Sequence, residues 1–241
     1  MAGLHELREA LIVATDSALC FILAFVLQDR SRALEGKSPP MEMWRTFIPL
    51  AVFLSEKAKT LNAPAFQGFW YRPPPHSRRR LLPLLMCAKN SKQIEAVVRQ
   101  HLFDMDMTTF GRTNLPENSS KAPTPDSSNS GANDRNKYQN LKGRLVQDSR
   151  DLRECWIDGS RYLTCEDIQH SFPNTYAARS TKWVDPTLQL PAVVGQYRRA
   201  FQLPLHRNTT PLEGINFGRR FLEVWATGNG INYRSKLNEW I

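Results

Sequence analysis

The side chains in this sequence best suited to hold a metal ion lie in its C-terminal part. They are Cys155, Cys165, His170 and His206, which together could supply four zinc ligands. In compact zinc modules the ligands come as closely spaced pairs at both ends of the module, and this spacing matches none of those modules. The sequence therefore predicts no metal site, and we expect neither a metal ion nor a cofactor.

Three carboxylates also lie near His170 in the sequence: Asp158, Glu166 and Asp167. A carboxylate beside a histidine can serve in acid–base catalysis, but a turn and a helix N-terminus explain these three better. The chain also contains no phosphate-binding loop, nucleotide-binding glycine pattern, nucleophile elbow or HExxH motif. The sequence predicts no catalytic residues, no enzymatic activity and no small-molecule substrate.

Basic residues could instead bind a polyanion such as a nucleic acid. Arg78, Arg79 and Arg80 form a triplet after three prolines, and Arg198 and Arg199 lie between Tyr197 and Phe201. Arginines interleaved with aromatic rings can contact phosphates and stack on bases. The alternatives are a solvated loop for the triplet and a half-buried strand for the second group. For residues 72–80, an error in the gene model is a further alternative.

The overall charge does not decide between these interpretations. The formal net charge of +9 divides into +4 for residues 1–110, +1 for residues 111–140 and +4 for residues 141–241. A nucleic-acid-binding surface normally concentrates its positive charge on one face or one helix. The charge therefore allows a polyanion as an alternative partner without favouring it.

Residues 111–140 separate the chain into two parts. Only Leu115 and Tyr138 in this stretch could anchor a core. Such a segment buries too little apolar surface to offset the entropy lost on ordering, about 1–2 kcal/mol per residue. We expect a disordered linker between a helical region, residues 1–110, and an α-rich region with minor β-structure, residues 141–241.

The most apolar segment, residues 10–27, is nearly long enough to cross a membrane. Asp16 lies within it, and a charge at membrane depth is costly. Apolar residues at alternating steps of three and four instead favour a buried helix. That stripe is wider than one antiparallel neighbour can cover, so we predict that a partner protein binds there. The candidate residues are Leu4, Leu7, Leu11, Phe21 and Phe25.

The other predicted elements make the fold mainly α, or α+β overall. Helices are expected at about residues 40–61, with a kink at Pro49, and at residues 91–103. Asp158-Gly159 between apolar residues predicts a short β-hairpin. Thr164 and Thr210 each begin an N-capping pattern, and the helix that follows Thr210 should end near Ala226. A final short helix is expected at about residues 233–240.

These features favour a non-enzymatic interaction or adaptor protein that forms part of a larger assembly. Four scattered cysteines and no recognisable secretory signal indicate an intracellular protein, without distinguishing nucleus from cytoplasm. A nucleic-acid-associated factor is the first alternative. A protein anchored in a membrane by residues 10–27 is the second, although we do not expect a membrane partner.

Overall fold

The computed structural model describes residues 2–67, 75–113, 130–162, 164–181 and 200–239. These residues are mostly helical and form no β-strand, so the prediction of a mainly α-helical fold is confirmed. The helices are α1 (Ala2–Leu34), α2 (Met41–Gln67), α3 (Pro75–Thr113), α4 (Ser130–Tyr162), α5 (Cys165–Ser171), α6 (Pro173–Ala177) and α7 (Pro211–Gly228), followed by the 3-10 helix η2 (Lys236–Glu239).

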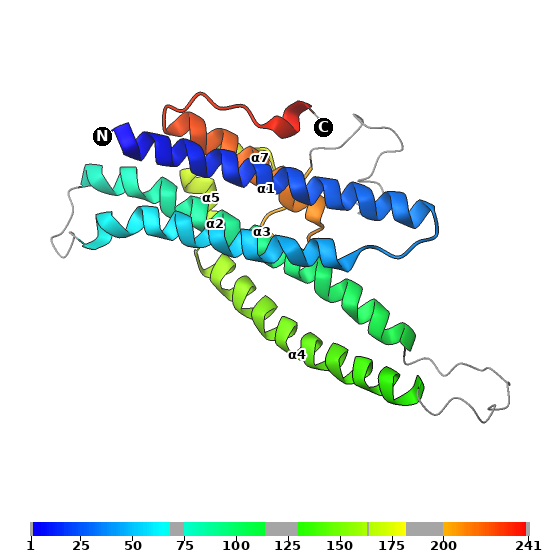
Figure 1. The fold of residues 1–241 in the computed structure, drawn as a ribbon. Coiled ribbons are helices and arrows are strands. Elements are labelled where there is room, and N and C mark those ends of the chain that lie inside the picture. The colour runs from blue at the N-terminus through cyan, green and yellow to red at the C-terminus, as the bar shows by residue number, and fades with distance from the viewer. Residues whose placement is uncertain (1, 68–74, 114–129, 163, 182–199, 240–241) are drawn as a thin grey trace.

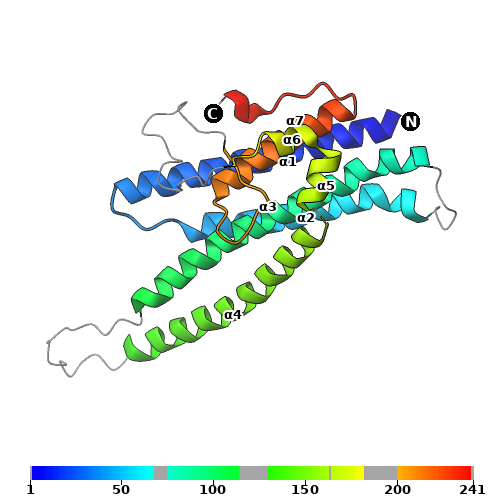
Figure 2. The same cartoon turned by 180° about the vertical axis from the view of Figure 1, so that it is seen from behind.

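Three long helices form the body of the molecule (Figure 1). α2 packs against both α1 and α3, while α7 packs against α1 and α3. α4 lies beside α3 on the side of the bundle away from α7 (Figures 1 and 2). The two parts predicted from the sequence therefore share one core, because α7 contributes Ile215, Phe217, Phe221 and Trp225 to the cluster that α1, α2 and α3 also line.

The first two helices form an antiparallel pair, joined by a short turn. Gly36 has a φ of 69°, a left-handed conformation that glycine adopts without steric cost. Its N–H donates to the carbonyl of Ala33, and the N–H of Lys37 donates to the carbonyl of Arg32. This pattern is a Schellman motif, which ends α1 and reverses the chain toward α2.

α7 begins with the capping box that the sequence predicts. The Thr210 side chain accepts from the backbone N–H of Glu213, and the Glu213 carboxylate accepts from the backbone N–H of Thr210. Further along, Gly218 lies against Leu19 and Ile94, where an added Cβ would come within about 3 Å of both side chains. The missing side chain lets α7 approach α1 and α3 closely. The shorter helix α5 has the same kind of capping box, between Thr164 and Asp167.

The predicted β-hairpin at Asp158-Gly159 is wrong, because both residues belong to α4. Leu141, Leu145, Leu152 and Cys155 are buried in this helix. With Asp148, they recur at alternating steps of four and three, which places them on one face of a helix. Burial of that face against α3 overrides the local preference of an Asp-Gly pair for a turn.

The predicted linker is also partly helical. Residues 111–113 end α3 and residues 130–140 begin α4, whereas residues 114–129 lie outside the described residues. Two other helices are longer than predicted, since α2 continues to Gln67 and α3 begins at Pro75. Of the predicted final helix, the structure describes the short 3-10 helix η2.

α4 is held on α3 by charged groups as well as by leucines. Glu95 is 1% exposed, and it accepts hydrogen bonds from Lys92 Nζ at 2.7 Å and from Arg99 Nε at 2.9 Å. On the α4 side, Arg99 reaches Asp151 at 3.4 Å and the Cys155 thiol donates to Glu95 at 3.4 Å. Burial, together with the nearby Glu95 carboxylate, raises the pKa of the Cys155 thiol to about 12. Cys155 is therefore a buried, protonated thiol at neutral pH.

A second carboxylate at this interface, Asp148, has a raised pKa. Burial is the largest cause, and nearby acidic side chains add to the rise while Arg45 and Arg99 oppose it. A raised pKa means that folding favours the protonated form. This contribution to stability is present below the pKa of the unfolded chain, and it is lost as the pH rises through the pKa of the folded protein.

Asp148→Asn should therefore stabilise the protein at pH 7 relative to the wild type, with an advantage that shrinks toward pH 3. The gain should be below about 1 kcal/mol, because water screens a partly exposed group. Urea unfolding at several pH values measures it. Glu154→Gln, an exposed carboxylate on the same helix, is the control. An equal response of both variants at every pH would contradict this account of the α3–α4 interface.

Candidate functional site

α1 has a second apolar face, which points away from the bundle. Its large residues are Leu7, Val13, Phe21, Leu27 and Leu34, with exposed fractions from 47% to 81%. Four small exposed residues alternate with them along the helix: Ala10, Ser17, Ala24 and Ser31. We call these nine residues the outer face of α1. In Figure 1, α1 lies along the front of the bundle with no labelled element crossing it.

The middle of the outer face carries no charge. Between Ala10 and Gln28, where the structure describes every residue, each exposed position is occupied by an uncharged side chain. The hydroxyl of Ser17 donates to the backbone carbonyl of Val13 at 2.8 Å, so this polar group is satisfied within the helix. Exposed faces of surface helices are normally rich in charged and polar residues. The outer face of α1 thus has the composition of a contact surface.

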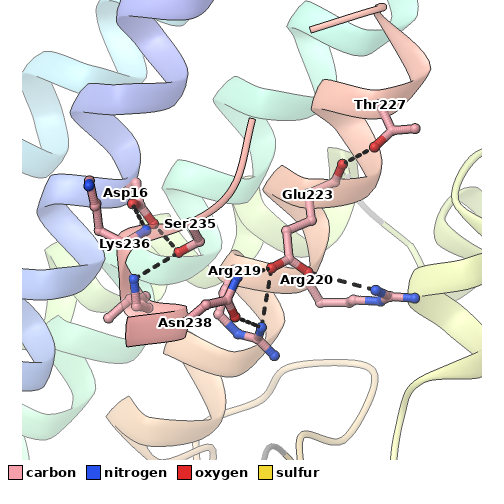
Figure 3. Close-up of polar contacts among 9 residues, drawn as sticks. Asp16, Arg219, Arg220, Glu223, Thr227, Ser235, Lys236 and Asn238 are labelled. Atoms are coloured by element: carbon pink, nitrogen blue, oxygen red, sulfur yellow. Dashed lines mark hydrogen bonds and ion pairs between the residues drawn. The ribbon is translucent and has the colours of Figure 1, made fainter. Parts of the chain in front are cut away.

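The inner face of α1 is fixed in the core by apolar residues and one buried charge. Asp16 is 3% exposed. Its carboxylate accepts from Ser235 Oγ at 2.5 Å and from the backbone N–H of Lys236 at 2.9 Å (Figure 3). Buried carboxylates require such partners, because desolvation of an unpaired charge is very costly. The sequence places the charge of Asp16 in an otherwise apolar segment, and the C-terminal segment supplies the hydrogen bonds that allow this carboxylate to be buried.

The same C-terminal segment is also attached to α7 (Figure 3). Arg219 donates to Asn238 Oδ1 at 2.6 Å and to Glu223 Oε1 at 3.2 Å, and Asn238 Nδ2 donates to Glu223 at 2.8 Å. Burial raises the pKa of the nearby Tyr233 hydroxyl, and the Asp16 carboxylate raises it further. Together these contacts hold residues 233–238 against α1 and α7, and they fix which face of α1 points outward.

A second cluster of hydrogen-bonded side chains, Asp29, Trp44 and His101, lies near the C-terminal end of α1. Trp44 Nε1 donates to Asp29 Oδ2 at 2.7 Å, and His101 Nε2 lies 3.4 Å from the same oxygen. The rings of Trp44 and His101 pack with centroids 4.5 Å apart. These contacts link α1, α2 and α3, so we assign a structural role to Asp29 and His101.

A pocket of about 430 Å³ opens beside this group, between α1, α3 and the start of α7. Val26, Ala33, Met105 and Leu212 supply apolar walls, and Arg30 and His101 supply polar groups. The volume is in the range of small-molecule sites. Asp29 and His101 are already engaged with each other, and Thr210, which also lines the pocket, is engaged with Glu213 in the capping box of α7.

Two further properties bear on the chemistry of the described residues. Among them, no three histidine, cysteine or acidic side chains are grouped so that they could hold a metal ion.

Residues 5–34 form a helix that is long and apolar enough to cross a membrane by length and composition, and 44% of its most apolar window is buried inside the protein. The core helix of a soluble protein and a signal sequence pass the same test of length and composition.

The predicted partner-binding residues are divided between the two faces of α1. Leu7 and Phe21 lie on the outer face, whereas Leu11 is buried and Phe25 packs edge-on against Trp44. The side chain of Leu4 lies outside the described residues. Val13, Leu27 and Leu34, which also lie on the outer face, were not among the predicted residues, although the apolar character of the helix on all sides was a signal that a second face existed.

The predicted polyanion-binding residues stay a prediction. Arg78, Arg79 and Arg80 lie within α3, but their side chains are outside the described residues, as are Arg198 and Arg199 entirely.

The comparisons with known proteins identify no relative. No protein-family model, no curated protein and no solved structure matches this chain. The functional argument therefore depends on the geometry of the site.

Asp16→Ala should lower the free energy of unfolding by about 2–4 kcal/mol, because Ser235 and the N–H of Lys236 lose a charged acceptor in the interior. Urea denaturation measures the loss, and hydrogen exchange should show earlier opening of residues 231–238. Glu9→Ala, an exposed carboxylate on the same helix, should change stability by less than about 0.5 kcal/mol. Equal stability of the two variants would contradict the structural role of Asp16.

Proposed function

We propose that this protein is a non-enzymatic interaction protein, a subunit or adaptor of a larger assembly, and that it binds its partner through the outer face of α1. The observation that carries this proposal is the row of five large apolar side chains left about half exposed or more on a helix whose other face is already in the core. Contiguous exposed apolar surface of this kind marks binding sites in soluble proteins.

The energy available at this surface supports the proposal. Full burial of a Val, Leu or Phe side chain contributes about 1.5–3 kcal/mol. Because Leu7, Val13, Phe21, Leu27 and Leu34 are about half exposed or more, a partner that covers them would gain roughly 4–9 kcal/mol before the costs of association. That gain needs no charged contacts, which agrees with the uncharged middle of the face.

The shape of the surface favours a helical partner segment. The outer face runs along one helix from Leu7 to Leu34, a stretch of 28 residues that is roughly 40 Å long. Ala10, Ser17, Ala24 and Ser31 have small side chains, so the surface of the helix is lower at these positions than at the large residues on either side. A second helix can approach closely at such positions.

A membrane-bound protein is the second candidate, favoured by the length and composition of residues 5–34. Against a spanning helix stands the inner face of α1, where Leu11, Ile12, Leu19 and Ile22 pack in the protein core. Crossing a bilayer would remove these residues from that core and separate Asp16 from Ser235. On this alternative, deletion of residues 10–27 would release the protein from membranes.

Affinity purification of the tagged protein from its own cells, treated with nuclease, tests the first proposal. Ser17→Lys places a charge in the middle of the outer face, and Ser149→Lys makes the same change at an exposed position of α4. We expect the wild type and Ser149→Lys to retain the same stoichiometric partners and Ser17→Lys to lose them.

Full retention of those partners by Ser17→Lys, with the variant folded as judged by circular dichroism, would overturn the proposed use of the outer face. Loss of all partners on nuclease treatment would instead favour the nucleic-acid alternative.

A further inference from the structure

The pocket of about 430 Å³ between α1, α3 and the start of α7 is a site separate from the outer face of α1. It is partly open to solvent, and its walls are mainly apolar. Small-molecule sites in proteins have this character, with a few polar groups that fix the orientation of the ligand. The polar groups at the pocket therefore indicate which kind of ligand fits it.

Arg30 lines this pocket and has no partner for its charge. It is half-buried, and its guanidinium makes no hydrogen bond or ion pair with any of the described residues. The arginines that line the smaller pocket between α2, α3 and α4 differ in this respect. There Arg45 pairs with Asp106, and Arg99 pairs with Glu95. Arg30 is thus a cation at the edge of an apolar pocket, with its N–H donors available to a ligand.

The carboxylate at the same pocket is less available than Arg30. Asp29 Oδ2 accepts from Trp44 Nε1 at 2.7 Å and lies 3.4 Å from His101 Nε2, while Asp29 Oδ1 is shielded from solvent. A cationic ligand would have to compete with Trp44 and His101 for this carboxylate, and Arg30 would repel it. An anionic ligand meets a guanidinium that no other group engages. The distribution of partners therefore favours a negative charge on the ligand.

We propose that this pocket binds a small monocarboxylic acid with an apolar body, such as a medium-chain fatty acid. The carboxylate pairs with Arg30, because the planar guanidinium matches the two oxygens of a carboxylate. The hydrocarbon part lies against the apolar walls, which include Val26, Met105 and Leu212. This ligand goes beyond the proposed function, since it occupies a site other than the outer face, and its binding involves no reaction.

Isothermal titration calorimetry of the purified full chain tests the charge of the ligand. Octanoate is the probe, and octanol and octylamine carry a neutral and a positive group on the same chain. At neutral pH, octanoate should bind at one site per chain and at least ten-fold more tightly than either analogue, because only the carboxylate gains charged hydrogen bonds from Arg30. Equal affinity for all three probes, tighter binding of octylamine, or no binding of octanoate would each overturn the proposal.

Substitution of Arg30 tests the assigned partner of the carboxylate. Arg30→Gln removes the charge, and Arg153→Gln makes the same change at an exposed position of α4. The affinity for octanoate should fall at least ten-fold in Arg30→Gln and stay unchanged in Arg153→Gln, whereas octanol should bind both variants equally. Unchanged affinity of Arg30→Gln for octanoate would contradict the role of Arg30.

A third pair of variants locates the bound chain, because octanoate could instead adsorb on the exposed outer face of α1. Ala33 lines the pocket, so Ala33→Trp should fill part of it and weaken octanoate binding at least ten-fold. Ala24→Trp makes the same change on the outer face and should leave the affinity unchanged. Circular dichroism checks that both variants are folded. Loss of binding in Ala24→Trp but not in Ala33→Trp would place the ligand on the outer face and overturn the proposed site.

Discussion

The structure depends on which face of α1 is buried in the bundle. This helix is apolar on all sides, so hydrophobicity alone does not decide which side is buried. On the buried side, Leu11, Ile12, Leu19 and Ile22 lie in the core together with Asp16, whose carboxylate accepts hydrogen bonds from Ser235 Oγ and the backbone N–H of Lys236. Because an unpaired carboxylate in the interior is strongly unfavourable, the C-terminal segment must stay in place when α1 is buried on this side. The outer face is then exposed as a consequence.

A second constraint acts on the opposite side of the bundle, where α4 joins α3. Few apolar residues are available on α4, and Glu95, Arg99 and Asp151 form a charged network across the interface. A charged network of this kind fixes the orientation and register of α4 against α3 more than it adds to the stability of the fold. The bundle therefore has one side where contacts are apolar and compact, around α7, and one side where they are polar, around α4. The outer face of α1 belongs to neither side.

Local chemistry could be predicted from the sequence better than long-range contacts. Both capping boxes, at Thr164 and Thr210, were predicted because a capping box involves only four consecutive residues. The hairpin at Asp158-Gly159 was wrong because its turn signal is weaker than the burial of Leu152 and Cys155 against α3. The partner of Asp16 lies 219 residues away, and no pattern within the sequence connects the two. The same limit explains why residues of the inner and outer faces of α1 were predicted as one surface.

The central claim is that the outer face of α1 is covered by protein in the cell. Maleimide labelling of Ser17→Cys tests it most directly, in the Cys20→Ser background and with Ser149→Cys as the reference for an exposed site. In dilute purified protein, both cysteines should react at similar rates. In intact cells, Ser17→Cys should be labelled at least ten times more slowly than Ser149→Cys. Equal labelling of the two cysteines in cells would contradict the claim.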